Sequence, residues 1–310
     1  MIDRQVERAL ANPSLAELIP TIEQALKQTP GLERMATRLA QALHNAVLDG
    51  GGPARTIADV LHGTWFGHPL HPALTDIPVG AWALAALFDL YAALGGGRFA
   101  ERTADTLIAL GAAGAVPTAL SGLADYSTIK EDAAAVGAAH AVLNSTALGL
   151  YLLSLWARKR GARGSGVLLA AVALGAVGLS AGLGGDLVYR HRIGVSHAPP
   201  ADEPEEWTAV LPLDELAHGV PQRVDLHGTP VLIYHDAGAV SAISAVCTHA
   251  GGPLDEGTFA DGCVECPWHQ SVFDVRDGRV VHGPATMSQP RYDARIHNGQ
   301  VEVRARSAGG

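Results

Sequence analysis

Apolar residues gather in four long stretches in the middle of the chain, at 77–96, 106–124, 138–157 and 166–185. The second and the fourth stretch contain no charged residue. A helix needs about 20 apolar residues to cross a bilayer, and backbone groups in lipid must find their hydrogen bonds within the helix. A buried helix of a soluble protein can be equally apolar, but four in succession with short connections predict a four-helix transmembrane bundle.

Different patterns flank this region. Residues 14–27 and 31–48 place apolar side chains three and four positions apart, which predicts two amphipathic helices. We expect Pro20 to break or kink the first, and the run of glycines before Pro53 to end the second. From Trp207 onward, short alternating segments are separated by turn residues, which is typical of a small antiparallel sandwich or barrel.

The expected fold class is therefore α + β and multidomain: a four-helix transmembrane bundle followed by a small antiparallel all-β domain. A segment rich in proline and acidic residues marks the boundary between the two. The expected parts are an amphipathic helical segment at 1–60, the transmembrane domain at 61–197, a linker at 198–206, the β domain at 207–305 and a tail at 306–310.

Composition excludes several classes of protein. Only 17% of the residues are charged, against about 25% in an average soluble protein. The net charge of −9 argues against a nucleic-acid binder, which would carry a basic patch. Three cysteines are too few for a disulfide scaffold, and the first ten residues contain no pattern of a cleavable signal peptide.

The β domain contains two short Cys/His pairs, Cys247-Thr248-His249 and Cys266-Pro267-Trp268-His269. Zinc is one candidate, since two thiolates and two imidazoles are a common zinc set. However, zinc fingers usually take both cysteines from one pair and both histidines from the other. A mixed pair on each of two loops fits a Rieske-type [2Fe–2S] centre better, because two cysteines hold one iron and two histidines the other.

The longer segments CTHAGGPLDEG and CPWHQSVFDVRDG resemble a Rieske ferredoxin, and the resemblance extends over about 207–304. It implies that Cys247 and Cys266 bind the inner iron and that His249 and His269 bind the outer iron. Gly252 and Trp268 occupy positions where some Rieske proteins carry an additional disulfide, and Gln270 replaces a common glycine for which the sequence offers no reason. We expect the third cysteine, Cys263, to be a strand residue rather than part of a redox dithiol.

Histidines and aspartates also gather at the ends of the apolar stretches. If the four helices cross the membrane alternately, one side carries His68, His71, His140, His191, Asp76 and Asp125. Neutral imidazoles suit a b-type haem iron, or can take protons from a quinol. A group of ordinary interface residues is the simpler alternative. Intramembrane Asp89 is a further candidate, as a functional carboxylate or as a residue facing other polar groups.

This region resembles a family of uncharacterised four-helix membrane proteins, through GHPLHPALTDIPVGAW at 67–82, SGLADY at 121–126, HAVLN at 140–144 and GGDLVYRHRIGV at 184–195. The resemblance covers about 60–195 and implies a fold but little chemistry. The distribution of arginine and lysine would place the β domain outside the cytoplasm. Because a folded cluster domain would then need export and no export signal is evident, we expect it on the cytoplasmic side of the cell membrane.

The sequence thus predicts a multi-pass, membrane-anchored electron-transfer protein. Its [2Fe–2S] domain would exchange single electrons between a redox partner protein and a quinone or haem at the histidine-rich edge of the bundle. One alternative is a tethered ferredoxin that serves a soluble oxygenase or reductase, with the bundle only an anchor. Another is an iron–sulfur redox sensor acting through the N-terminal helices. A terminal Rieske oxygenase is disfavoured, since no mononuclear-iron domain is recognisable after His269.

Overall fold

The structure, a computed structural model, describes residues 15–236 and 238–306. The expectation of no signal peptide, which concerns the first ten residues, lies outside the described residues, as does most of the expected tail at 306–310. The chain folds into two compact units. We call them the helical unit, with residues up to 50 and 70–193, and the β unit, with residues 51–69 and from 194 onward.

The helical unit begins with the two expected amphipathic helices, α2 (Leu15–Gln28) and α3 (Leu32–Asp49). Their presence confirms the prediction from apolar spacing. Pro20 lies inside α2 without ending it, so the expected break is wrong.

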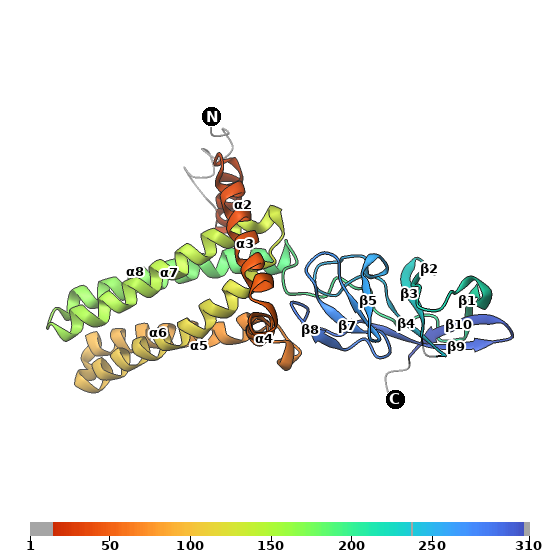
Figure 1. Cartoon of the computed structure of the whole chain (residues 1–310). Coiled ribbons are helices and arrows are strands. Elements are labelled where there is room, and N and C mark those ends of the chain that lie inside the picture. The colour runs from red at the N-terminus through yellow and green to blue at the C-terminus, as the bar shows by residue number, and fades with distance from the viewer. Residues whose placement is uncertain (1–14, 237, 307–310) are drawn as a thin grey trace. The chain divides into compact units, whose positions relative to one another are not determined.

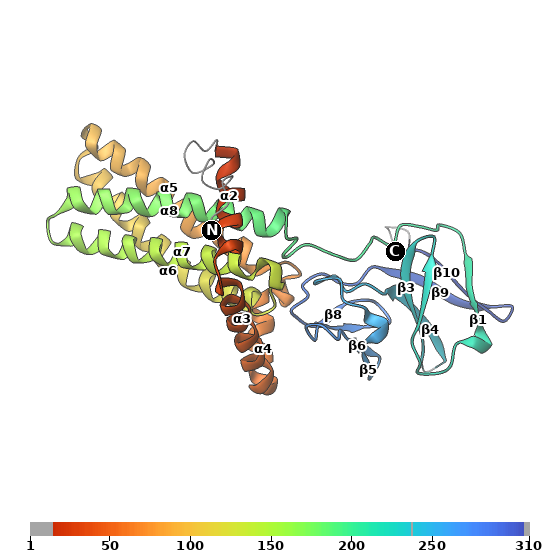
Figure 2. The same cartoon turned by 90° about the horizontal axis from the view of Figure 1, so that it is seen from above.

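Four longer helices follow and run alongside one another (Figures 1 and 2). They are α5 (Leu70–Tyr91), α6 (Gly97–Ser127), α7 (Glu131–Lys159) and α8 (Arg163–Tyr189). A π-helical turn, Ala92–Gly96, joins α5 to α6, and Gly95 reverses the chain there with a φ of 106°. Such a positive φ is accessible to glycine at little cost.

This connection corrects the expected helix count. The apolar run Leu70–Ser127 counts as one candidate span although the chain reverses within it at Gly95, so the described residues contain three candidate membrane spans rather than four, the first of them formed by the α5–α6 hairpin. The other two are Glu131–Lys159 and Arg163–Tyr189. The helical part of the chain also contains more helices than a four-helix bundle, since α2 and α3 belong to the same unit.

The α5–α6 and α7–α8 hairpins are structural repeats of each other. Three residues of α5 each face the residue at one constant offset in α7; the pairs are His71 with His140, Trp82 with Tyr151 and Asp89 with Arg158. The ring centroids of the first two pairs are 6.1 Å and 4.3 Å apart. Since the pairs advance together along both helices, α5 and α7 run parallel to each other.

The β unit contains a helix that the sequence did not predict, α4 (Gly51–His62), followed by a 3-10 turn, η1 (Thr64–Phe66). The glycines before Pro53 do interrupt the preceding helix, with a φ of 62° at Gly51. Pro53 then lies in the first turn of α4, where a missing N–H costs nothing because it would have no partner within the helix.

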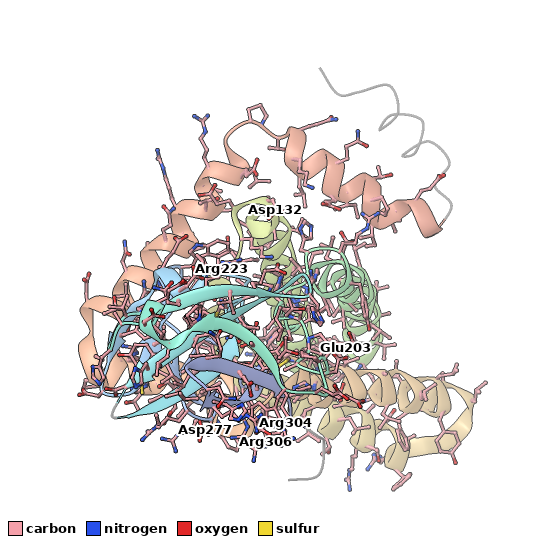
Figure 3. The ribbon with its side chains drawn as sticks, turned by 90° about the vertical axis from the view of Figure 1, so that its right-hand side faces the viewer. Asp132, Glu203, Arg223, Asp277, Arg304 and Arg306 are labelled. Carbon is pink, nitrogen blue, oxygen red and sulfur yellow. The ribbon has the colours of Figure 1, made fainter. Side chains whose placement is uncertain are left out.

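The remainder of the β unit consists of two antiparallel sheets, which confirms the expected all-β character. One sheet has the order β1-β10-β9-β4-β3-β2 and the other β5-β6-β7-β8. The strands are β1 (Thr208–Pro212), β2 (Gln222–Leu226), β3 (Thr229–Asp236), β4 (Ala239–Ser244), β5 (Thr258–Ala260), β6 (Cys263–Glu265), β7 (Val272–Asp274), β8 (Val280–His282), β9 (Arg291–His297) and β10 (Gln300–Ala305). Arg304 of β10, labelled in Figure 3, lies over the ring of Trp207 at 4.6 Å. It also pairs with Asp293.

Candidate functional site

Two loops of the β unit have the same backbone arrangement, and each begins at a cysteine. In the first, between β4 and β5, the N–H of Cys247 donates to the carbonyl of Gly252 at 2.8 Å, and the N–H of Gly251 donates back to Cys247 at 2.9 Å. In the second, between β6 and β7, the corresponding bonds join Cys266 to Ser271 at 2.8 Å and Gln270 to Cys266 at 3.1 Å. The two loops therefore present their side chains in equivalent positions.

The fourth residue after each cysteine adopts a positive φ, 87° for Gly251 and 56° for Gln270. The first value suits glycine, whereas a side chain in this left-handed region costs roughly 1–2 kcal/mol. The structure thus explains why glycine is favoured at position 270. It also shows that Gln270 adopts the same backbone conformation at a cost.

The loops bring the four predicted cluster ligands together in two pairs. Cys247 and Cys266 are buried, with 1% and 2% of their surface exposed, and their thiols are hydrogen-bonded to each other. His249 and His269 are half-buried, and their ring centroids lie 5.0 Å apart at an interplanar angle of 86°. Sulfur donors lie inside and nitrogen donors nearer the surface.

The hydrogen bond between the two thiols shifts their pKa values in opposite directions. It raises the pKa of Cys247 and lowers the pKa of Cys266 to about 7. Backbone N–H groups of Trp268 and His269 lower the pKa of Cys266 further, whereas burial opposes this shift. A thiolate is the form that binds a metal, so both thiols would lose their protons on ligation.

Close packing explains a glycine in the first loop. A Cβ added to Gly252 would lie 2.8 Å from the Sγ of Cys266, closer than real Cβ atoms approach. A side chain at this position would therefore displace the inner thiol. The donor set of two thiols and two imidazoles, held by two equivalent loops, fits a [2Fe–2S] group.

Two neighbouring residues complete the surroundings. The hydroxyl of Ser271 accepts a hydrogen bond from the N–H of Ala285 at 3.0 Å, which leaves its own proton available for another acceptor. The third cysteine, Cys263, pairs with Asp274 across β6 and β7 and is half-buried. It occupies a strand, as expected.

In the helical unit, the structure brings two of the six candidate membrane residues face to face. His71 and His140 lie with their ring centroids 6.1 Å apart and nearly perpendicular, at 83°. The Nδ1 of His71 is 2.9 Å from the carbonyl oxygen of Thr118, and that of His140 is 2.9 Å from the carbonyl oxygen of Ser180. Both contacts favour the tautomer that carries its proton on Nδ1.

Each of these rings also lies over a glycine of the adjacent helix. A Cβ at Gly122 would come within 2.8 Å of the His71 ring, and one at Gly184 within 3.1 Å of the His140 ring. The Nε2 of His140 lies 3.1 Å from the side-chain nitrogen of Asn144. The glycines allow the histidines to enter the bundle, and the backbone carbonyls fix their orientation.

The other candidates are not part of this pair. His68 contacts the carbonyl oxygen of Pro69 at 3.2 Å and belongs to the β unit, Asp76 is exposed, and Asp125 is half-buried. His191 lies instead at a separate group, 3.2 Å from Glu23 and 3.5 Å from Asp132.

The sequence did not reveal Glu23 as a neighbour of Asp186 and His191, because α2 is far from the end of α8 in the chain. Their ligating atoms all lie within 4.8 Å of one another. Ion pairs with Lys27 and Arg190 already compensate the charge of Glu23. Burial raises the pKa of Glu23, but hydrogen bonds with Lys27 and Asp186 and the nearby charges of Lys27 and His191 lower it to about 2. We therefore interpret this group as an ion-pair network that joins α2 to α8.

The presence of a carboxylate at Asp89 is explained by its ion pairs with two arginines. Its carboxylate accepts two hydrogen bonds from the guanidinium of Arg158, at 2.7 Å and 2.5 Å, and both side chains are buried. Arg163 adds a third contact at 3.2 Å. This intramembrane carboxylate is compensated by arginine and lies with other polar groups.

Comparison with known proteins identifies two families. Residues 206–293 match the Rieske [2Fe-2S] domain, and residues 67–197 match a family described as Predicted membrane protein (DUF2231). Both resemblances that the sequence indicated are thereby confirmed.

Several ferredoxins are similar to part of the chain. The anthranilate 1,2-dioxygenase ferredoxin subunit of Burkholderia cepacia is 35% identical over 98 residues, which cover 32% of this chain and 91% of that protein. The naphthalene 1,2-dioxygenase ferredoxin component of Pseudomonas aeruginosa is 29% identical over 99 residues, covering 32% and 95%. Among solved structures, the ferredoxin of carbazole 1,9a-dioxygenase from Nocardioides aromaticivorans is 34% identical, covers 32% of this chain and 98% of its own, and has a TM-score of 0.31.

Proposed function

Because this chain belongs to the Rieske [2Fe–2S] family through residues 206–293, we propose that it is a membrane-anchored carrier of single electrons. Cys247 and Cys266 would hold the inner iron of the cluster, and His249 and His269 the outer iron. When bound, the cluster supplies a reversible one-electron couple. The observation that carries this proposal is the pairing of two buried thiols and two half-buried imidazoles on equivalent loops.

The residues around these ligands have two roles: some exclude water from the thiols, and others form an exposed edge beside the histidines. Buried Leu254, Val264 and Phe273 pack with the two cysteines and keep water away from the thiolates. The half-buried histidines lie beside exposed Pro267 and Trp268. We propose that a redox partner docks on this exposed edge, because it offers the shortest path to the outer iron.

The helical unit would anchor the carrier. Three candidate spans and a match to a membrane-protein family support membrane localisation. We propose that 61–197 is the membrane domain, 198–206 the linker and 207–305 the cluster domain, and that the cluster domain lies on the cytoplasmic side. Tethering raises the effective concentration of a donor and an acceptor that share one membrane.

Protease digestion of sealed vesicles of known orientation tests the sidedness. The cytoplasmic arrangement predicts cleavage of the cluster domain in inside-out vesicles only. Cleavage in right-side-out vesicles would contradict it.

We propose a quinone as the redox partner in the membrane, with His71 and His140 as the residues that contact it. His71, with its proton fixed on Nδ1, can accept a quinol proton on Nε2, whereas the Nε2 of His140 is already held by the side-chain nitrogen of Asn144. A b-type haem is the second candidate for the same pair. Haem is less favoured, since ligation through His140 would displace the contact between its Nε2 and Asn144.

Substitution of these histidines tests this part of the proposal. In proteoliposomes loaded with a quinol, His71→Ala and His140→Ala should each slow reduction of the cluster at least tenfold, while reduction by dithionite remains complete. Asp76→Asn is a matched control, because Asp76 is exposed near the start of the same helix. Unchanged quinol oxidation in both histidine variants would exclude the membrane site.

The second candidate function is a tethered ferredoxin that delivers electrons to an oxygenase or reductase. The similarity to ferredoxin components of dioxygenase systems favours it. In this case the histidine variants would keep full electron transfer to a soluble acceptor, and Trp268→Ala would impair it by weakening the docking edge. The same set of variants therefore separates the two functions.

A further inference from the structure

Within the β unit, helix α4 contacts the strands and loops of the β domain through two charged residues on one of its faces. The guanidinium of Arg55 donates to the carboxylate of Glu265 at 3.2 Å and to the backbone carbonyl of Gln270 at 2.7 Å. One turn later, the carboxylate of Asp59 contacts the Nδ1 of His282 at 2.8 Å and accepts the N–H of Gly283 at 2.8 Å. These are side-chain contacts between segments more than 200 residues apart in sequence.

The contacts are concentrated at the candidate cluster site. Glu265 directly precedes Cys266 and Gln270 directly follows His269, so Arg55 binds both ends of the second ligand loop. Gly283 begins the segment whose Ala285 donates to Ser271 of the same loop. Helix α4 thus holds two of the segments that shape the site.

The opposite face of α4 is apolar and exposed. With 3.6 residues per turn, Ile57 and Val60 project away from the face that carries Arg55 and Asp59. They are 62% and 49% exposed. Helix α4 is therefore amphipathic: its charged face binds the β domain, and its apolar face is exposed.

Two aromatic residues extend this apolar face. The indole nitrogen of Trp65 donates to the carbonyl of Val60 at 3.1 Å, which folds the ring back onto the last turn of α4. The ring of Phe66 lies 5.5 Å from that of Trp65, and both are more than half exposed. Ile57, Val60, Trp65 and Phe66 together form what we call the apolar face.

The position of this face in the chain indicates what covers it. Only three residues separate Phe66 from Leu70, where the first candidate membrane span begins. Tryptophan and other aromatic residues are enriched at the lipid–water boundary, and two-sided helices lie in that boundary with the apolar face inward. Residues 51–66 precede the part of the chain that matches the membrane family, at 67–197, and are separate from the Rieske match at 206–293.

We propose that α4 and η1 form a surface helix that lies in the lipid–water boundary and clamps the cluster domain to it. The apolar face would enter the boundary region of the bilayer. On the other face, Arg55 binds the second ligand loop and Asp59 binds the segment at Gly283. The cluster domain would then be held at the membrane surface and would not swing freely on the linker. This inference rests on the proposed membrane anchoring.

Photo-crosslinking to lipid tests the membrane contact. Ile57→p-benzoylphenylalanine and Val60→p-benzoylphenylalanine are introduced separately into the full chain, loaded with its cluster and reconstituted in phosphatidylcholine–phosphatidylglycerol vesicles. Val220 and Ile296 of the β unit, 45% and 43% exposed, are matched control positions. The surface-helix proposal predicts phospholipid adducts at 57 and 60 at least fivefold above those at 220 and 296.

Flotation of the same vesicles separates failure of this proposal from failure of membrane anchoring. Protein that floats with the vesicles but forms only protein adducts, or no adducts, at 57 and 60 would overturn the surface helix and leave the anchoring intact. Protein that does not float would overturn the proposed function itself. Equal lipid adducts at all four positions would also contradict a specific apolar face.

Hydrogen–deuterium exchange tests the clamp. In the double variant Arg55→Ala/Asp59→Ala, amides of residues 51–62 and 266–270 should exchange at least tenfold faster. Arg223→Ala is the control, since Arg223 forms an ion pair with Asp255 at 3.1 Å in the same unit. Unchanged exchange in the double variant, or equal acceleration in the control, would contradict the clamp.

Discussion

Arg55 donates a hydrogen bond of 2.7 Å to the backbone carbonyl of Gln270, a residue whose φ of 56° lies in the left-handed region. Gln270 occupies in the second ligand loop the position that Gly251 occupies in the first. The bond uses the backbone of Gln270, so it does not depend on the side chain. The strained conformation is thus stabilised from outside the loop, by a residue of a helix that precedes the membrane spans.

Gln270→Gly should stabilise the cluster domain by about 1 kcal/mol, because glycine adopts a left-handed φ without the cost that a side chain imposes. The thermal midpoint of the loaded protein should rise by a few degrees. Gln270→Ala is the control and should give no gain, since alanine keeps the Cβ. A gain of equal size in both variants would show that the backbone conformation is not the cause.

Removal of either inner thiol should abolish loading of the cluster. Cys247→Ser and Cys266→Ser are expected to retain less than a tenth of the iron and acid-labile sulfide of the natural protein. Cys263→Ser should retain both in full, because Cys263 lies in β6 and pairs with Asp274. The assignment of ligands would be wrong if Cys263→Ser lost the cluster and Cys266→Ser kept it.

The carboxylate of Asp274 makes stability depend on pH. Hydrogen bonds from Arg276 hold the pKa of this buried carboxyl below its ordinary value of 3.8, although burial acts in the opposite direction. Arg279 adds an ion pair at 3.1 Å. A group whose pKa is lower in the folded state stabilises that state above the unfolded pKa and loses this contribution as the pH falls through the folded pKa.

Asp274→Asn should therefore lower stability at pH 7 by about 2 kcal/mol, a typical value for a lost hydrogen bond to a charged group. The difference from the natural protein should shrink as the pH falls below about 4, where an unfolded aspartate becomes protonated. Urea unfolding of the β unit, followed by tryptophan fluorescence at several pH values, measures it. A difference that did not change with pH would assign the loss to packing instead.

The buried pair of Asp89 and Arg158 should be structural. Loss of Asp89 leaves buried Arg158 with a single carboxylate, that of the partly exposed Asp105 at 2.9 Å, so Asp89→Leu should cost about 3 kcal/mol, the lower end of the range for a broken buried pair. Asp89→Leu/Arg158→Leu should recover most of this loss, since no unpaired charge is left by that exchange, although Asp105 and Arg163 remain nearby. Thermal unfolding in detergent measures both. A double variant no more stable than Asp89→Leu would contradict this interpretation.

The sequence predicted those features that depend on local pattern. Apolar stretches of membrane length, alternating segments after Trp207 and the two Cys/His pairs are all visible in a single chain. The two family resemblances followed from short, distinctive segments and were confirmed. The count of candidate spans was wrong because only a tight turn at Gly95 separates α5 from α6, so the two helices count together as one candidate span.

Features that depend on contacts between distant segments were not predictable. Glycines before Pro53 indicate the end of one helix but not the start of α4, whose charged residues find their partners more than 200 positions away. The repeat of the two hairpins was missed because facing positions carry different residues, such as Trp82 and Tyr151. Equivalent places in a fold need not show similar side chains.

The reduced-minus-oxidised visible spectrum of the full-length protein, purified in detergent, distinguishes a Rieske cluster from a haem. We expect the broad bands of a Rieske cluster, with two irons and two sulfides per chain, and no sharp haem band. A haem band beside the cluster would replace the quinone by haem at the histidine pair. Absence of the cluster bands after iron and sulfide have been supplied under reducing conditions would contradict the assignment of this chain as a Rieske electron carrier.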